Sequence, residues 1–532
     1  MIVAANPLAA AAGREMLRMG GDAVDAAIGA QMVLNLVEPQ SSGIGGGGFL
    51  LYYERASRRI QAYDGRETAP TRATPDLFLD KAGRPLRFMD AVASGLSVGV
   101  PGVLRMLEMA HREHGRLPWP LLFEPAIRLA EEGFPLSPRL HALLMEEEQL
   151  GRSAEARELY FDAVGRPLPI GTMIRNPRLA ETFRRIAQDG ADAFYSGPIA
   201  QDIVAAVATH PTRPGGLSLA DLGAYRAVER EPVCGPYRIW VICGMPPPSS
   251  GGVTVLQILT LLERFPLNQE PVLSARFAHL FAEAGRLAFA DRKRYLADSD
   301  FVQVPVLALI DRRYLARRSE LISTDHSLGV ASPGEIKLAR ADPVSQPEPV
   351  STTHLSIVDA EGNAVSFTSS VESEFGSRIQ VDGFLLNNQL TDFAFEPTVD
   401  GVAVANRVEA GKRPLSSMAP TFVFDQAGNL VAVLGSPGGS RIIPYVAEAI
   451  IALLDWRLSP AAAAALPHIA NRNGATELEA GTPAEKLAAA LMALGHDVEV
   501  EDMISGLHII VIHNGVLMGG ADPRREGVAL GD

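Results

Sequence analysis

The sequence predicts an α+β fold in which antiparallel sheets are layered between helices. Two observations indicate this class: β-hairpins with alternating apolar residues, and segments with helical apolar spacing on either side of them. One hairpin pairs residues 352–359 with 364–370 across a turn at 360–363, and another pairs 421–425 with 430–435 across a turn at 426–429. Helices are then expected at 442–453 and 483–494, and strands at 498–501 and 508–512 close the chain.

The region before residue 352 is predicted to be mainly helical. Asn6 and Pro7 are typical of a helix start, and that helix is expected to stop at Gly20 and Gly21. The other expected elements are a helix at 22–37, a glycine-rich loop at 38–48, a strand at 49–53, and helices from 102 to 210 with loops at 133–135 and 165–167. Residues 341–351 contain three prolines and no apolar periodicity, so we expect an exposed, extended segment there.

Length and composition are those of a globular protein. The 532 residues suggest two to four structural units, and 47% hydrophobic with 21% charged residues lies close to the soluble average. No run of eighteen apolar residues offers a membrane span. The net charge is -14, of which residues 352–532 carry -12. Such acidity argues against nucleic-acid binding and implies that local arginines hold any anionic substrate.

Neither the cysteines nor the N-terminus indicates export. Cys234 and Cys243 are too few for a disulfide framework and wrongly spaced for a metal site, so they are expected to be core residues, and no metal or cofactor is predicted. The N-terminus lacks the basic region of a signal peptide, which predicts a cytoplasmic protein unless a leader has been trimmed from a periplasmic or secreted one.

Two motifs match well-known patterns in the wrong context. Residues 43–48 satisfy G-x-G-x-x-G, but a helix precedes them and a strand follows, the reverse of a dinucleotide site. We therefore expect a tight turn that lets backbones pack closely. Residues 95–99 satisfy G-x-S-x-G, but Val98, Val100 and Pro101 delay any helix, so Ser97 is expected to be a structural serine in an extended segment.

Thr352 is the candidate nucleophile. A Thr-Thr pair at the start of a strand is usually just β-propensity, but here a Pro-rich linker ends at Ser351 and a strand begins. At such a junction the threonine hydroxyl can attack the preceding carbonyl by an N-to-O acyl shift. The freed α-amine, with an ordinary pKa of about 7.7 to 8.0, is a suitable base for that same hydroxyl. His354 is then needed neither as a base nor as a ligand.

A glycine-rich turn could supply the oxyanion hole. Gly438 and Gly439 lie between a predicted strand and a predicted helix, where backbone amides can point into a site. A plain strand-to-helix turn is the alternative reading of the same residues.

Seven blocks together resemble the γ-glutamyltranspeptidase family from about Val3 to the C-terminus. They occur in the order found in that family and comprise residues 38–48, 64–70, 246–252, 352–354, 385–393, 412–418 and 435–440. The resemblance implies an N-terminal-nucleophile (Ntn) hydrolase αββα sandwich. It also implies self-cleavage between Ser351 and Thr352 into a large fragment, 1–351, and a small fragment, 352–532, which stay together as a heterodimer; further homo-oligomers remain open.

The resemblance also implies a role for each matching residue. Thr352 would be nucleophile and, through its amine, base, with Gly438 and Gly439 as the oxyanion hole. A γ-glutamyl group would be held at both ends by residues of matching chemistry: Arg66, Ser416 and Ser417 on the α-carboxylate, and Gln389 and Asp392 on the α-ammonium.

The chain departs from many relatives at two places. Ser370 and Glu372 stand where Thr and Asn are common, but Ser370 can still bond the terminal amine and Glu372 would strengthen ammonium binding. The segment between Asp392 and Ser416 has no tyrosine and looks shorter than the lid of several members. A reduced lid makes transfer to amino acids less certain than hydrolysis.

The predicted function is therefore that of a self-processing γ-glutamyltransferase or glutathione hydrolase, acting on glutathione-like amides with water or an amino acid as acceptor. Within the same fold, a glutaryl-type cephalosporin acylase and a poly-γ-glutamate depolymerase are alternatives. A non-catalytic relative that binds a partner is the alternative from another class.

Overall fold

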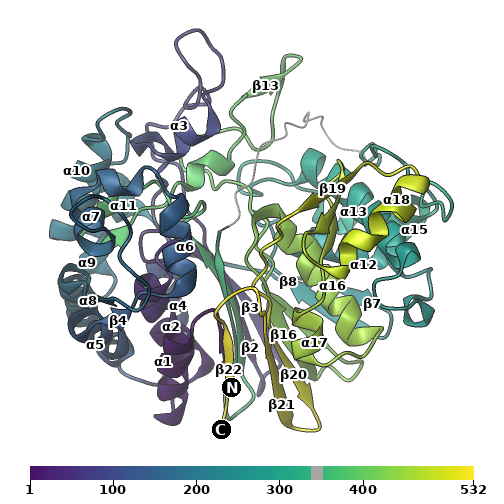
Figure 1. The fold of residues 1–532 in the computed structure, drawn as a ribbon, viewed down its shortest axis with the longest axis horizontal. Coiled ribbons are helices and arrows are strands. Elements are labelled where there is room, and N and C mark those ends of the chain that lie inside the picture. Colours follow the sequence, from purple (N-terminus) through teal and green to yellow (C-terminus); the bar gives the residue numbers. More distant parts are fainter. Residues whose placement is uncertain (337–350) are drawn as a thin grey trace.

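The computed structural model describes residues 1–336 and 351–532. Two antiparallel sheets face each other at the centre, and a layer of helices covers the outer side of each sheet (Figure 1). This arrangement confirms the predicted α+β sandwich of helix, sheet, sheet and helix. Among the described residues, no helix is long and apolar enough to cross a membrane.

The first sheet joins both ends of the chain to the strand that follows Thr352. Its order is β22 (Val528–Leu530), β1 (Ile2–Ala4), β9 (Thr353–Val358), β10 (Ala364–Ser370), β2 (Gly47–Glu54), β3 (Arg59–Gly65) and β6 (Val228–Arg230). The sequence analysis found β9, β10 and β2, but missed β1, β22, β3 and β6. Because this sheet combines strands from before and after Thr352, with β1 lying between β22 and β9, the two predicted fragments share one core rather than forming separate units.

The second sheet contains the other predicted hairpin. Its order is β21 (Val516–Ala521), β20 (His508–His513), β16 (Leu430–Gly435), β15 (Thr421–Phe424), β8 (Trp240–Gly244) and β7 (Val233–Tyr237). Strands 498–501 and 508–512 are present as β19 (Val498–Glu501) and β20, but they do not close the chain, since β21 and β22 follow.

The helical layers pack on the outer faces of the sheets. On the first sheet lie α1 (Pro7–Arg18), α2 (Ala23–Val37) and α4 (Val103–His114); on the second lie α12 (Gly251–Leu262), α16 (Ile442–Leu454) and α17 (Pro460–Ala464), with α13 (Ala275–Tyr295) behind α12. The Asn6 side chain caps α1, as predicted, and a capping box formed by Asp22 and Asp25 starts α2. Every residue of α2 is buried, which explains its apolar character all round.

Further helices extend both outer layers. On the side of the first sheet they are α5 (Glu124–Glu132), α6 (Pro138–Glu146), α8 (Pro177–Asp189) and α10 (Gly197–Ala208), and the other side carries α15 (Arg312–Ser319) and α18 (Ala488–Ala493). The helix expected at 483–494 is divided into a 3-10 turn, Pro483–Leu487, and α18.

The contact between the two sheets is polar along the first half of β9. Leu355 and Ile357 face the helical layer and belong to its apolar cluster, whereas His354 and Ser356 face the second sheet. The Ser356 hydroxyl donates to the His508 carbonyl (2.8 Å), and His508 Nδ1 donates to the His354 carbonyl (2.7 Å). Alternation along β9 thus separates an apolar outer face from a hydrogen-bonded inner face.

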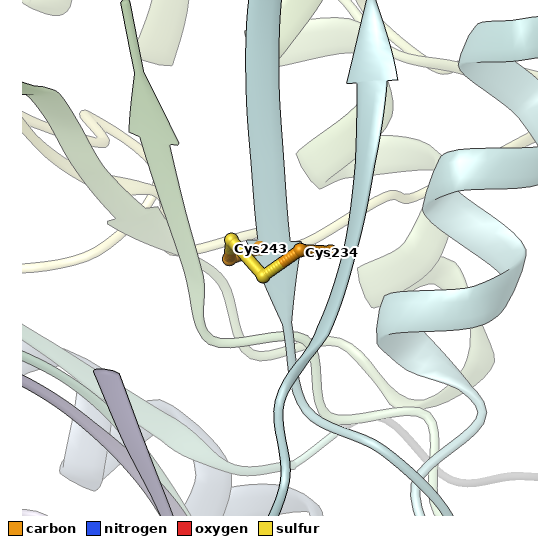
Figure 2. Close-up of a disulfide and its surroundings, with 2 residues drawn as sticks. All are labelled: Cys234 and Cys243. Atoms are coloured by element: carbon orange, nitrogen blue, oxygen red, sulfur yellow. A yellow bond between two sulfur atoms is a disulfide. The ribbon is translucent and has the colours of Figure 1, made fainter. Parts of the chain in front are cut away.

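The expectation that the two cysteines are unlinked core residues is wrong. Cys234 and Cys243 form a disulfide across the neighbouring strands β7 and β8, with their Cα atoms 4.1 Å apart (Figure 2). Cys243 is buried, but Cys234 is exposed. The register of this hairpin places the two residues directly opposite each other, which is what makes a short-range bridge possible.

The two misleading glycine motifs have structural roles. A side chain at Gly45 or Gly46 would lie 2.1 Å from a backbone carbonyl, so these glycines allow the close packing that was predicted. Ser97 is fully buried and donates to the carbonyls of Val92 and Ser94, both at 2.8 Å. It lies in a short 3-10 turn, Gly95–Ser97, and not in the extended segment that was expected.

The expected exposed segment at 341–351 falls largely outside the described residues. Only Ser351 can be assessed, and it is fully buried, so the expected exposure is wrong at this position.

Candidate active site

Thr352 lies immediately before β9 and is almost completely buried. Its φ angle of 108° is unusual for a β-branched residue, because the left-handed region is sterically unfavourable for a side chain of this shape. Its hydroxyl donates to Ser370 Oγ (3.1 Å), which also accepts the backbone N–H of Glu372 (2.8 Å). The candidate nucleophile and Ser370 are therefore in direct contact through their hydroxyls; the predicted bond from Ser370 to a free Thr352 amine stays a prediction.

The glycine turn after β16 faces the bond that precedes Thr352. The backbone N–H of Gly438 donates to the carbonyl of Ser351 at 3.4 Å, and Gly439 lies in the same pocket as Thr352. Both glycines have positive φ angles, 136° and 59°. A side chain on Gly438 would lie 2.7 Å from the Tyr445 ring, so this turn requires glycine.

Arg66 is buried beside the pocket and pairs with Asp392. Its Nη2 donates to Asp392 Oδ2 (2.5 Å) and to the Leu415 carbonyl (2.9 Å), while Nε donates to the Pro414 carbonyl (3.1 Å). The guanidinium is thus held by the segment that leads into Ser416 and Ser417. Fixed in this way, it can offer its charge to a carboxylate without losing side-chain entropy.

Two acidic side chains, Asp392 and Glu372, stand together in the pocket, and Asp392 is the one that pairs with Arg66. Gln389 donates to Asp392 Oδ2 (2.7 Å), and Glu372 accepts from Ser373 Oγ (2.7 Å) and from the Asn388 amide. Burial, reinforced by the nearby Asp392 charge, raises the pKa of Glu372 well above its ordinary value. A cation bound beside Glu372 would stabilise its carboxylate form and lower this pKa. The acidic corner formed by Glu372 and Asp392 therefore favours a positively charged group.

Nearly all the predicted site residues line one small pocket. It has a volume of about 30 Å³ and is lined by Arg66, Thr352, Ser370, Glu372, Gln389, Asp392, Ser416, Ser417, Met418, Gly439 and Ile442. Gly438, the remaining predicted site residue, contacts Ser351 instead. This volume corresponds to roughly one water molecule, so the pocket of the uncut chain is too small for a substrate.

The sequence analysis missed residues that support the pocket from outside. Arg292 of α13 donates to Ser417 Oγ (2.7 Å) and to Ser250 Oγ (2.8 Å), and Arg525 donates to the Thr352 carbonyl (2.9 Å). Glu67 is buried behind Arg66, and burial raises its pKa to about 8. Single arginines in a helix or near the C-terminus carry no motif that could have indicated these contacts.

One group of potential metal ligands occurs in the described part of the chain, away from this pocket. His279, Glu283 and His496 are buried close together, but His279 Nδ1 and His496 Nε2 bond each other directly (2.7 Å). Their remaining ring nitrogens bond Ser323 and Thr476, and Arg286 pairs with Glu283. The cluster is therefore satisfied as a hydrogen-bonded link between α13 and the loop after α18.

The segment in which a reduced lid was predicted forms a small hairpin. Strands β13 (Thr398–Val399) and β14 (Val402–Ala403) project at the top of the molecule as drawn in Figure 1. That this segment is a reduced lid stays a prediction.

Comparisons with known proteins agree with the sandwich fold. The family model described as "Gamma-glutamyltranspeptidase" matches residues 9–532. The chain is 37% identical to the glutathione hydrolase proenzyme of Bacillus subtilis (strain 168), over 100% of this chain and 91% of that protein. It is 35% identical to the acylase ACY 1 proenzyme of Pseudomonas sp. (strain SE83), over 100% of this chain and 93% of that protein.

Solved structures show the same architecture. The crystal structure of cephalosporin acylase from Bacillus halodurans superposes with a TM-score of 0.86 at 27% identity, covering 99% of this chain and 94% of that one. The fold is that of the Ntn hydrolase superfamily, and with the family model covering almost the whole sequence, the chain belongs to the γ-glutamyltranspeptidase family of proenzymes.

Proposed function

We propose that this protein is a self-processing γ-glutamyl hydrolase and transferase of the glutathione hydrolase type, with Thr352 as its nucleophile. The observation that carries the proposal is a cation and two carboxylates in the pocket that contains Thr352: Arg66, which pairs with Asp392, and Glu372 close to Asp392. A γ-glutamyl group has one carboxylate and one ammonium on its α-carbon, and such a site complements both charges.

Processing is the first reaction. Thr352 Oγ1 attacks the Ser351 carbonyl carbon, the hydroxyl proton passes to the departing amine, and the peptide becomes an ester. Water then hydrolyses the ester, leaving a Ser351 carboxylate on fragment 1–351 and a free Thr352 amine on fragment 352–532. The contact between Gly438 and the Ser351 carbonyl supports this step, because that oxygen gains negative charge in the transition state.

Turnover repeats the chemistry on a substrate. The Thr352 amine takes the hydroxyl proton as Oγ1 attacks the γ-carbonyl, and the leaving amine receives that proton. Water or an amino acid then releases the γ-glutamyl group from its ester with Thr352. Departure of Ser351 would open the space that the substrate acyl group needs.

A glutaryl-type acylase is the second candidate, because relatives of both kinds have similar identity to this chain. The acidic corner argues against it. A glutaryl group has no ammonium, so it would leave the buried Glu372 carboxylate without a cation to offset its desolvation.

Two measurements test the proposal. A denaturing gel should show two fragments in place of the 56.8 kDa chain, with the smaller one starting Thr-Thr-His-Leu. The purified protein should then hydrolyse a γ-glutamyl anilide at least about 100-fold faster, in kcat/KM, than the matching glutaryl anilide. A chain that stays whole yet turns over substrate would exclude the Thr352 mechanism, and a preference for glutaryl would make it an acylase. A whole chain with no turnover would indicate a binding protein.

A further inference from the structure

Arg525, near the C-terminus, contacts the residue that would become the new N-terminus. Its Nη1 donates to the Thr352 carbonyl (2.9 Å) and its Nε donates to the Ser505 carbonyl (3.0 Å). The side chain is buried, and Nη2 has no hydrogen-bond partner within residues 1–336 and 351–532. Burying a guanidinium is costly, and this one is placed against two backbone carbonyls, those of Thr352 and Ser505.

Acidic groups compensate the Arg525 charge without bonding it directly. Glu38 lies nearby, where it accepts from the Thr353 hydroxyl (3.3 Å), and Glu374 and Asp522 contribute further negative charge. Arg139, 4.0 Å from Glu38, adds a second cation to the group. The arginine is thus tolerated in the interior while its donors remain available to backbone carbonyls.

Thr352 is held in its unfavourable conformation by contacts on every side. The Ser351 hydroxyl donates to the Gln40 carbonyl (2.8 Å), Gly438 donates to the Ser351 carbonyl, and the Thr352 hydroxyl donates to Ser370. Arg525 alone of these groups fixes the carbonyl side of Thr352. A residue with φ near 108° persists only when its surroundings over-determine it, so each contact contributes to keeping the strain.

The strain has a direct connection to cleavage. The φ angle of Thr352 is defined by the carbonyl carbon of Ser351, and breaking that bond removes the constraint altogether. Strain stored at this position therefore favours the cleaved product, provided that the rest of Thr352 cannot move to relieve it in the uncut chain.

Arg525 lies in the segment that joins β21 to the last strand, β22. It lies just before β22, which pairs with β1, which in turn pairs with β9 through Ala4 and Leu355. β22 is the edge strand of the first sheet, and the Arg525 guanidinium bonds Thr352, just before the start of β9. The contact spans 173 residues of sequence, so it cannot form before the C-terminal segment has been made and folded.

We infer that Arg525 is a positioning residue for self-cleavage: it holds the Thr352 carbonyl so that the strained bond is cut only after β22 has docked. The inference rests on the proposed cleavage before Thr352. Arg525 takes no part in bond making; the attack, proton transfer and hydrolysis remain those described for Thr352.

The test compares cleavage rates of purified precursor on denaturing gels. R525Q, which keeps one shorter neutral donor, should slow cleavage by about 10- to 100-fold, the usual cost of losing a charged hydrogen bond. R525K, which restores charge and a donor, should recover part of the rate. R18Q is the matched control, since Arg18 pairs with Asp532 at the exposed end of the same segment and does not contact Thr352.

A second readout separates positioning from general stability. Once processed, R525Q should show a lower kcat with a nearly unchanged KM, because Arg66 and Asp392 still bind the substrate while Thr352 is misplaced. A variant damaged only in stability would lose active protein, and its kcat per active site, counted by burst titration, would stay at the wild-type value. That result, or wild-type cleavage rates in both R525Q and R525K, would overturn the role of Arg525.

The dependence on β22 has its own variant. A529P places proline in β22, where it disfavours the strand but leaves Arg525 unchanged, and it should slow cleavage as R525Q does. Wild-type cleavage in A529P would refute the coupling to strand docking. If the unmodified chain is never cut, the proposed cleavage is wrong, and this inference is wrong with it. If the unmodified chain is cut but the variants do not show the expected slower cleavage, only this inference is wrong and the proposed function stands.

Discussion

The backbone N–H of Gly438 points at the carbonyl oxygen of Ser351, 3.4 Å away. In the uncut chain, the predicted oxyanion donor is therefore already hydrogen-bonded to the carbonyl that Thr352 would attack. A substrate γ-carbonyl would have to occupy the same place after cleavage, since the nucleophile is the same atom. One amide can thus serve both processing and turnover, which ties the two activities to a single backbone conformation.

G438A should block cleavage. An alanine side chain would lie 2.7 Å from the Tyr445 ring, and the residue's φ of 136° is one that only glycine adopts easily, so the amide would turn away from Ser351. We expect the cleavage rate to fall by at least about 100-fold, the typical loss for one oxyanion donor. G223A is the control, because Gly223 is exposed with open space around it. Normal cleavage in G438A would remove this glycine from the oxyanion site.

T352A and S97A should give opposite results. Without the Thr352 hydroxyl there is no nucleophile for either reaction, so T352A should remain a single band and show no turnover above background, a loss of more than about 1,000-fold. S97A removes a hydroxyl that bonds only nearby carbonyls, and it should be cleaved and active like the wild type. An inactive S97A beside an active T352A would reverse the assignment.

Most residues of the candidate site could be predicted from the sequence because they lie in seven recognisable blocks. Ser370 and Glu372 lie outside the blocks and were identified as departures from many relatives. Those blocks contain Arg66, Asp392, Ser416 and Thr352, and the fold brings them to one pocket. Arg525 and Arg292 could not be predicted, since each acts through a contact made by tertiary packing and has no local pattern around it.

The fold was harder to predict where elements are short. Strands β1 and β22 have only three residues each, too few for alternation to be visible, yet they form one edge of the first sheet. The disulfide was missed for a related reason. Cys234 and Cys243 are opposite each other only if the β7–β8 hairpin is recognised, and that hairpin was not part of the prediction.

D392N should change the choice of substrate rather than the chemistry. Asparagine keeps the shape of Asp392 but not its charge, so it loses the attraction for an α-ammonium. We expect kcat/KM for a γ-glutamyl anilide to fall by about 10- to 100-fold, while that for a glutaryl anilide stays the same or rises. D400N, in the exposed turn of the β13–β14 hairpin, should match the wild type. Equal losses of kcat/KM on both substrates would mean that Asp392 does not bind the α-ammonium.

Comparison of the two substrates needs fully processed protein. Asp392 also pairs with Arg66, so the D392N sample should first be shown by gel to be cut to the wild-type extent. Rates are then normalised to the amount of the small fragment.

Acid should destabilise the contact between the two sheets. His508 is buried there as a neutral imidazole that donates from Nδ1 to the His354 carbonyl, and burial lowers its pKa to about 4. Because the unfolded chain binds this proton near pH 6.5, the stabilisation is complete above that pH and is lost as the pH falls toward 4. This one group should cost about 2 kcal/mol between pH 7.5 and pH 5.

H508N tests this expectation, since asparagine keeps a donor but cannot be protonated in this range. The shift in unfolding temperature between pH 7.5 and pH 5, followed by circular dichroism, should be smaller in H508N than in the wild type. The quantity to compare is this temperature shift in H508N minus the same shift in the wild type. Buried acids such as Glu67, with a pKa of about 8, change stability in the opposite direction, and their contribution is common to both proteins. H513N, at the exposed end of the same strand, should leave the wild-type pH dependence unaltered. If H508N and H513N lose the same amount on acidification as the wild type, the polar contact between β9 and β20 is not where acid acts.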